Sequence, residues 1–232
     1  MKKIIAIVLV FMLLSVPVYA EEMSINDWFE EHYFTVWWDD SDDYIRGSYY
    51  GYNIQFEDEK LYINSTWVQN VEITEKDGEF YGGVDELEEL YSGDLIVIGG
   101  CTFTKRVSDA LETLKEEYPD EYKLVKNLRT ISEGNRGLAF FNLQSATFSL
   151  YDTCDKNWLM SGILHEAVHV TDYNNGLFKI DSDGKWNIDE MEGRTYDAQR
   201  KFLTKLNAQS WIDYIDKEFE RQYWKDLKYY AR

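Results

Sequence analysis

Two histidines and a glutamate in the second half of the chain have the spacing of a metal-binding helix, in the run His165-Glu166-Ala167-Val168-His169. Residues four positions apart project from one face of an α-helix, so both imidazoles can bind one metal ion. Glu166 is offset by one position, and its carboxylate can reach a water molecule on that metal without being a ligand. The run therefore predicts zinc-assisted hydrolysis, with Glu166 as the general base.

The composition makes this motif specific. The chain has only three histidines, His32, His165 and His169, and two of them form the pair. A chance match is on the order of a few in a thousand. The surrounding residues are apolar at helical spacing, and we expect a buried helix that Asp155 caps and that ends near Gly176.

Zinc in a catalytic site takes three protein ligands and leaves a fourth position open, so a third ligand is needed. Asp172 lies three residues after His169 on the same helical stripe, and could bind the metal or orient a ligand. Glu190 is another acidic candidate. There is no Gly-x-x-His continuation after the motif, which excludes a third histidine.

The motif resembles the active-site helix of the zincin metallopeptidases, and the acidic helix that follows resembles their gluzincin branch. In that branch the third ligand is a glutamate on a later helix, which corresponds here to Glu192. The segments His169–Tyr173 and Glu192–Gln199 are similar to those of bacterial members, with Thr195 where alanine is usual. Better-known gluzincins carry an aspartate four residues after the ligand glutamate, where this chain has Tyr196 and then Asp197.

The resemblance implies an α+β fold with an active-site helix and a small mixed sheet over residues 101–232. It implies that His165, His169 and Glu192 hold Zn²⁺. A neighbouring strand, Ala146–Tyr151, would bind substrate by edge pairing. A tyrosine or the backbone would have to stabilise the oxyanion, and Tyr196 and Tyr173 are the candidate tyrosines.

The elements that must position these residues can be predicted from periodicity. Alternating runs flank turns at 57–60 and 75–78, which predicts two hairpins and a β-rich segment over 21–100. Helical spacing runs from Phe103 to about Thr130 with a break at Pro119. Strands are expected at Leu138–Leu143 and Ala146–Tyr151, and the tail from Glu190 is mostly helical.

Charge divides the chain into two parts. The formal net charge is −19, and residues 21–100 hold 21 of the 43 acidic residues but only 3 of the 24 basic ones. We therefore place a boundary at residue 100, between an acidic, aromatic-rich segment of unknown role and a catalytic domain at 101–232. Such acidity argues against a nucleic-acid partner.

The N-terminus has the layout of a secretory signal peptide. Two lysines precede an apolar run from Ile4 to Val18, and Val18-Tyr19-Ala20 is a small-residue cleavage site. The sequence thus predicts a signal peptide at 1–20, a secreted, periplasmic or extracellular location, and no stable membrane anchor after cleavage. Export would favour one disulfide between Cys101 and Cys154.

Together these features predict a secreted zinc peptidase that acts on peptide or protein substrates. Two alternatives remain open. One is a secreted binding protein on a zincin-like scaffold without activity, which the presence of Glu166 argues against. The other is a zinc amidase that acts on cell-wall peptides with the same chemistry. Neither the substrate nor the oligomeric state follows from the sequence.

Overall fold

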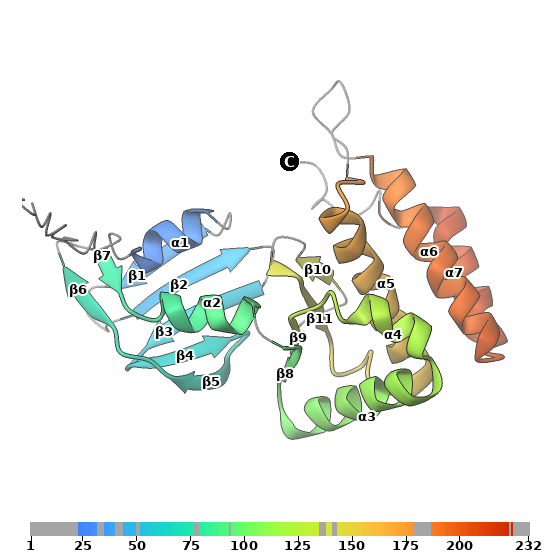
Figure 1. Ribbon diagram of the computed structural model, residues 1–232, viewed down its shortest axis with the longest axis horizontal. Coiled ribbons are helices and arrows are strands. Elements are labelled where there is room, and N and C mark those ends of the chain that lie inside the picture. Colours follow the sequence, from blue (N-terminus) through green and yellow to red (C-terminus); the bar gives the residue numbers. More distant parts are fainter. Residues whose placement is uncertain are drawn as a thin grey trace, which may run out of the picture.

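The computed structural model describes residues 23–31, 35–39, 44–49, 52–76, 79–92, 94–134, 138–140, 143–178, 187–222 and 224. The predicted signal peptide lies outside these residues. The chain is α+β, as predicted, with one half built around a five-stranded sheet and the other around a four-stranded sheet with helices (Figure 1). Within the described residues, no helix combines the length and apolar character needed to span a membrane.

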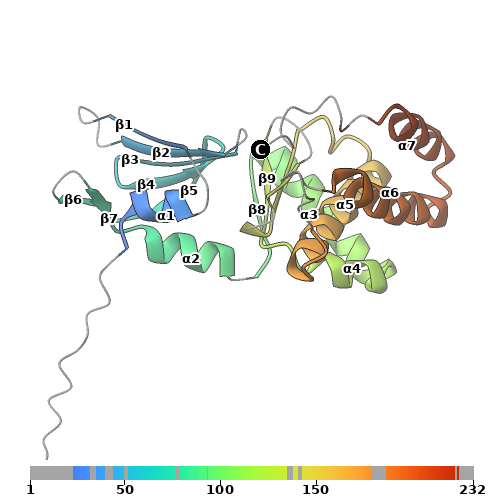
Figure 2. The ribbon, with the colours of Figure 1, turned by 90° about the horizontal axis from the view of Figure 1, so that it is seen from above.

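The N-terminal half is an antiparallel sheet with two helices on one of its faces (Figure 2). A short hairpin, β6 and β7, precedes the second helix. The elements in chain order are α1 (Ile25–Glu31), β1 (Thr35–Asp39), β2 (Tyr44–Tyr49), β3 (Tyr52–Glu57), β4 (Lys60–Ile63), β5 (Thr66–Asn70), β6 (Thr74–Lys76), β7 (Glu79–Tyr81) and α2 (Val84–Ser92).

Two tight turns confirm the hairpin predicted around 57–60 and extend the sheet by one strand. Asp58 and Glu59 both have positive φ angles, of 51° and 57°, between β3 and β4. Asn64 and Ser65 repeat the pattern, at 48° and 66°, between β4 and β5. Positive φ at both central residues is the geometry of type I′ turns, whose twist matches that of the strands.

The C-terminal half has a mixed sheet in the order β10-β11-β9-β8. β8, β9 and β11 are parallel, and β10 is antiparallel to β11. The elements are β8 (Ile96–Ile98), α3 (Cys101–Glu117), α4 (Pro119–Val125), β9 (Thr130–Glu133), β10 (Leu138–Phe140), β11 (Ser145–Phe148), α5 (Lys156–Asn174), α6 (Ile188–Lys205) and α7 (Gln209–Arg221).

Strand β8 belongs to the second sheet, although it lies before the boundary predicted at residue 100. It pairs there with β9. Ile98 and Leu143 also belong to the hydrophobic core of the N-terminal half, and Asn64 donates a hydrogen bond of 3.2 Å to the Ser132 hydroxyl across the junction. The N-terminal half therefore packs against the second sheet.

The structure corrects two further expectations. The strand predicted to bind substrate at an edge, Ala146–Tyr151, corresponds to β11, and that prediction is wrong because β11 pairs with β10 on one side and β9 on the other. The predicted disulfide is not formed, since Cys101 and Cys154 are exposed free thiols. Instead, Arg106 donates to the Cys154 sulfur at 3.5 Å.

Helix α5 is the centre of the second half, and its start is capped as predicted. Asp155 accepts a hydrogen bond of 2.8 Å from the backbone N–H of Trp158, which satisfies one of the unpaired donors of the first turn. The helix ends before Gly176, whose φ of +67° favours glycine.

Removing this cap should weaken the fold. We expect Asp155→Ala to lower the free energy of unfolding by about 1 kcal/mol, because the Trp158 N–H loses its acceptor. Urea unfolding followed by circular dichroism measures this. Asp155→Ser keeps a capping oxygen and should retain most of the stability. Equal stability of Asp155→Ala and the wild type would show that the cap contributes nothing.

Candidate metal centre

The candidate site lies between α5 and α6, which pack side by side. His165, Glu166 and His169 come from α5, and their potential ligand atoms lie within 4.8 Å of one another. His169 and Glu166 are buried, at 1% and 8% exposure, while His165 is partly exposed. The two imidazole rings are 4.9 Å apart between centroids. The structure therefore places the three motif residues together on one helix face.

Helix α6 brings a second carboxylate to the same place. Glu192 Oε2 lies 3.6 Å from His165 Nε2, and Glu192 Oε1 lies 3.5 Å from His169 Nε2. Glu192, Thr195 and Gln199 follow one another at helical spacing and are all buried. The buried face of α6 therefore faces the histidines. Thr195, which lies between Glu192 and Gln199 on this face, is at the position where the resemblance predicts alanine.

These separations suit a metal ion. The distances between the Glu192 oxygens and the two Nε2 atoms are too long for good hydrogen bonds. Two ligand atoms that each lie about 2.1 Å from one tetrahedral zinc ion are about 3.4 Å apart, close to the 3.5 and 3.6 Å observed. Two neutral imidazoles and a carboxylate are also a donor set that zinc accepts. His165, His169 and Glu192 are therefore able to hold one zinc ion together.

Burial keeps both imidazoles in the form that binds metals. It lowers the pKa of His165, against the opposing effects of the Glu192 charge and the Gln199 hydrogen bond. Burial also lowers the pKa of His169 to about 3, although the Glu192 charge acts in the other direction. Both rings are thus neutral at physiological pH and keep a lone pair for a ligand.

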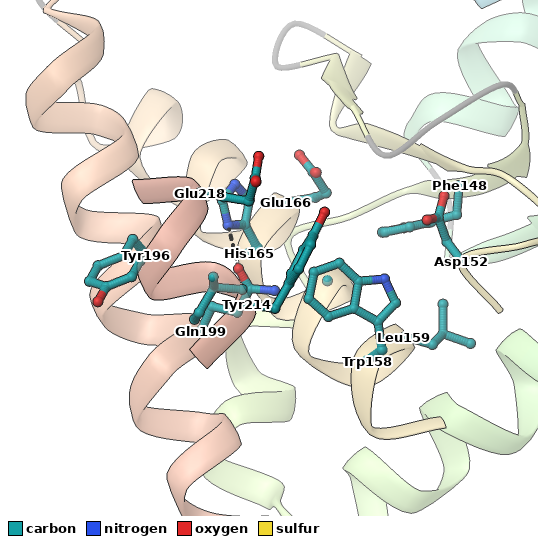
Figure 3. Close-up of a pocket in the computed structure, with 12 residues that line it drawn as sticks. Phe148, Asp152, Trp158, Leu159, His165, Glu166, Tyr196, Gln199, Tyr214 and Glu218 are labelled. Atoms are coloured by element: carbon teal, nitrogen blue, oxygen red, sulfur yellow. Dashed lines mark hydrogen bonds between the residues drawn. The ribbon is translucent and has the colours of Figure 1, made fainter. Parts of the chain in front are cut away.

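Gln199 contacts one of the two histidines, His165, and can fix the direction of its ring. Its Oε1 lies 3.1 Å from His165 Nδ1 (Figure 3). The other ring nitrogen, Nε2, faces Glu192. Gln199 Nε2 in turn donates to the Ser161 hydroxyl at 3.2 Å, which fixes the direction of the amide. Gln199, seven residues after Glu192, thus contacts one ring nitrogen of His165 while Glu192 faces the other.

The two other candidate ligands are held elsewhere. Arg194 Nε donates to Asp172 Oδ2 at 2.5 Å, and Arg194 Nη1 donates to Glu190 Oε1 at 2.9 Å. The side chain of Glu190 is 61% exposed, whereas that of Glu192 is 2% exposed. Arg194 therefore binds the carboxylates of both Asp172 and Glu190. Of these two residues and Glu192, only Glu192 faces both imidazoles.

Glu166 has a different environment from Glu192. Its pKa is raised well above the ordinary value, first by burial and then by the charges of Glu192 and Asp152, while a backbone hydrogen bond from Ala139 opposes the rise. Ala139 is in β10, an edge strand in the described part of the sheet. Glu166 and His165 also line a cavity of about 230 Å³ (Figure 3). Glu166 is thus the carboxylate that faces open space.

The two tyrosines proposed for the oxyanion are used in other ways. The Tyr196 hydroxyl donates to Asp216 Oδ1 at 2.6 Å, and its ring stacks on Phe219. Tyr173 is 39% exposed and packs edge-on against Phe178. Sequence reasoning also missed Tyr214 and Glu218, which reach the cavity from α7. Their place depends on how α7 folds back, which no local pattern encodes.

The comparisons with known proteins add no identification. The chain matches no protein family, no curated protein and no solved structure at a significant level.

Proposed function

We propose that the chain is a secreted zinc metallopeptidase of zincin architecture, in which His165, His169 and Glu192 hold the metal. One observation carries the proposal: a buried carboxylate from α6 faces the Nε2 atoms of both motif histidines at 3.6 and 3.5 Å. Zinc, when bound there, would supply a Lewis acid that polarises a carbonyl and lowers the pKa of water. The proposed export rests on the N-terminal sequence alone.

The two carboxylates then have separate roles. Glu192 is buried between the helices and faces both rings, which suits a ligand. Glu166 lines the cavity and suits a general base that takes a proton from the attacking water and returns it to the leaving amine. The same group serves both proton transfers because it lies beside the cavity where the substrate would bind.

The edge strand supports a peptide as substrate. In the described part of the sheet, β10 has a neighbouring strand, β11, on one side and none on the other. The backbone of Ala139 in β10 forms a hydrogen bond with Glu166. An extended peptide that adds to this edge would pass directly in front of the general base. We therefore propose Leu138–Phe140, in place of Ala146–Tyr151, as the strand that pairs with a substrate.

Metal analysis and a peptide library test the proposal. We expect about one zinc ion per chain and cleavage of peptides that stops with a chelator and returns with zinc. Freshly purified protein without zinc affinity would refute the metal site. Zinc binding without any hydrolysis would instead favour the binding-protein alternative.

The contact between Gln199 and His165 gives a further prediction. Gln199→Met removes the hydrogen bond but keeps a similar volume, and we expect zinc affinity to fall about 10–100-fold, as for other outer partners of zinc histidines. Competition with a chromogenic chelator measures the affinity. Gln199→Glu keeps an acceptor for Nδ1 and should bind zinc more tightly than Gln199→Met. Equal affinities in all three proteins would exclude the orienting role.

A further inference from the structure

The cavity beside the candidate metal centre is small. Its volume of about 230 Å³ is below the roughly 300–1,000 Å³ of sites for drug-sized ligands. His165 and Glu166 form one wall, so a side chain that fills the cavity belongs to a residue beside the reacting bond. The cavity is therefore placed to select one residue of the substrate.

The remaining walls are mostly apolar and aromatic. Trp158 from α5 and Tyr214 from α7 lie edge to face, with ring centroids 5.5 Å apart. Trp158 also stacks on Trp211 at 4.6 Å, which holds α7 against α5. Leu159 and Ile215 line the same space. These aromatic walls are fixed by packing between two helices, so the pocket is formed before a substrate arrives.

A glycine keeps the pocket open. Gly162 lies within α5, where glycine costs about 0.5–1 kcal/mol relative to alanine. A Cβ atom at this position would lie 3.2 Å from Cε1 of Phe148, which is tighter than ordinary packing. Both residues line the cavity. The missing side chain thus leaves room for Phe148 and for a substrate.

Two carboxylates give the pocket its charge. Asp152 and Glu218 lie on opposite sides of the pocket in the view of Figure 3. Asp152 is held by Ser149 through Oδ2, at 2.9 Å from the backbone nitrogen and 2.6 Å from the hydroxyl. Glu218 lies 3.3 Å from the exposed Arg221, which does not line the cavity. No lysine or arginine occurs among the described residues that line it.

We propose that this pocket selects a lysine or arginine side chain next to the scissile bond. This inference rests on the proposed peptidase function and names its substrate class. A long basic side chain combines an apolar stem, which suits the aromatic walls, with a cation that the carboxylates attract. The rings of Trp158 and Tyr214, which line the cavity, are partners that can add cation–π attraction. An acidic side chain would instead meet Asp152, Glu218 and Glu166, with no lysine or arginine among the described lining residues to pair with.

The same chemistry could be offered by the free amino terminus of a peptide. We assign the pocket to a side chain because an amino terminus lacks the long apolar stem that the walls of the cavity require. Peptides with acetylated amino termini distinguish the two sources, since they keep the lysine and lose the terminal cation. Selection that disappears on acetylation would overturn the assignment.

The test uses the zinc-loaded protein and a blocked peptide series that carries Lys, Arg, norleucine or Glu at one varied position. We expect kcat/KM for Lys and Arg to exceed that for norleucine by at least about tenfold, and Glu to be the poorest. Mass spectrometry should place the cut directly beside the basic residue. Equal cleavage of the Lys and norleucine peptides would refute the inference while the peptidase function stands.

Variants connect the preference to the two carboxylates. In Asp152→Asn combined with Glu218→Gln, the ratio of Lys to norleucine cleavage should fall toward one. Asp213→Asn combined with Glu220→Gln removes the same charge from exposed positions on α7 and should leave the ratio unchanged. Equal ratios in the two double variants would refute the assignment. Circular dichroism checks that both are folded.

A binding measurement separates this inference from the proposed function. Calorimetry with acetyl-lysine amide and acetyl-norleucine amide compares the two side chains without hydrolysis. Tighter binding of the lysine compound by a protein that cleaves no peptide would support the pocket and refute the peptidase. Equal binding of the two compounds would refute the pocket whatever the activity.

Discussion

Replacing Glu166 with glutamine should greatly slow hydrolysis while zinc binding is retained. The amide has the shape of the carboxylate but cannot accept a proton at physiological pH, so the attacking water loses its base. General base catalysis contributes about 10²–10⁴-fold, and we expect a loss of that size in kcat/KM. Metal content by mass spectrometry should stay at about one zinc per chain, since Glu192 rather than Glu166 is the proposed ligand.

The control for this variant removes a similar carboxylate elsewhere. Glu112 is exposed on α3, and Glu112→Gln should keep full activity. Full activity of Glu166→Gln would mean that another group is the base. Loss of zinc from Glu166→Gln would instead make Glu166 a ligand, because its oxygen lies within the same 4.8 Å group as the two histidines.

The sequence predicted the elements whose signals are local. The cap at Asp155, the end of α5 near Gly176 and the break at Pro119 are all present, because each depends on residues within one or two helical turns. The turn at 57–60 is local in the same way, since it joins neighbouring strands. The pairing of His165 with His169 follows from helical geometry alone.

Contacts between distant segments explain what the sequence left open. Asp172 has the helical spacing of a ligand, but Arg194 on α6 binds it. From the sequence, β11 is a possible edge strand, but in the structure β10 pairs with it. From the sequence, β8 belongs to the acidic segment, but in the structure it pairs with β9. Both outcomes depend on which strands meet, and sequence periodicity carries no information about that.

The acidic segment also has a structural role that its charge does not indicate. Its core includes Leu143, which lies beyond the segment, and Ile98, whose strand β8 belongs to the second sheet, alongside Phe56 and Leu87. Removing 21–100 would expose Leu143 and would take β8, with Ile98, from the second sheet. Any loss of activity on such a deletion would therefore follow from unfolding of the sheet, and would not by itself show a role in recognition.

The second large effect is expected at Glu192. Replacing it with alanine or glutamine removes the carboxylate that lies 3.6 and 3.5 Å from the two Nε2 atoms. We expect zinc affinity to fall by more than the roughly 10–100-fold typical of an outer partner, and hydrolysis to be lost with the metal. Chelator competition measures the affinity, and circular dichroism checks the fold, because Glu192 is buried.

Asp172→Asn and Glu190→Gln are the matched controls, since each removes one carboxylate that Arg194 binds. Both should keep zinc affinity closer to the wild type than Glu192→Gln does. Asp172 is buried and paired, so Asp172→Asn is expected to lower stability more than affinity. Full zinc affinity in Glu192→Gln together with its loss in Asp172→Asn would move the third ligand to α5. The contact between Arg194 and Asp172 would then have to open when the metal binds.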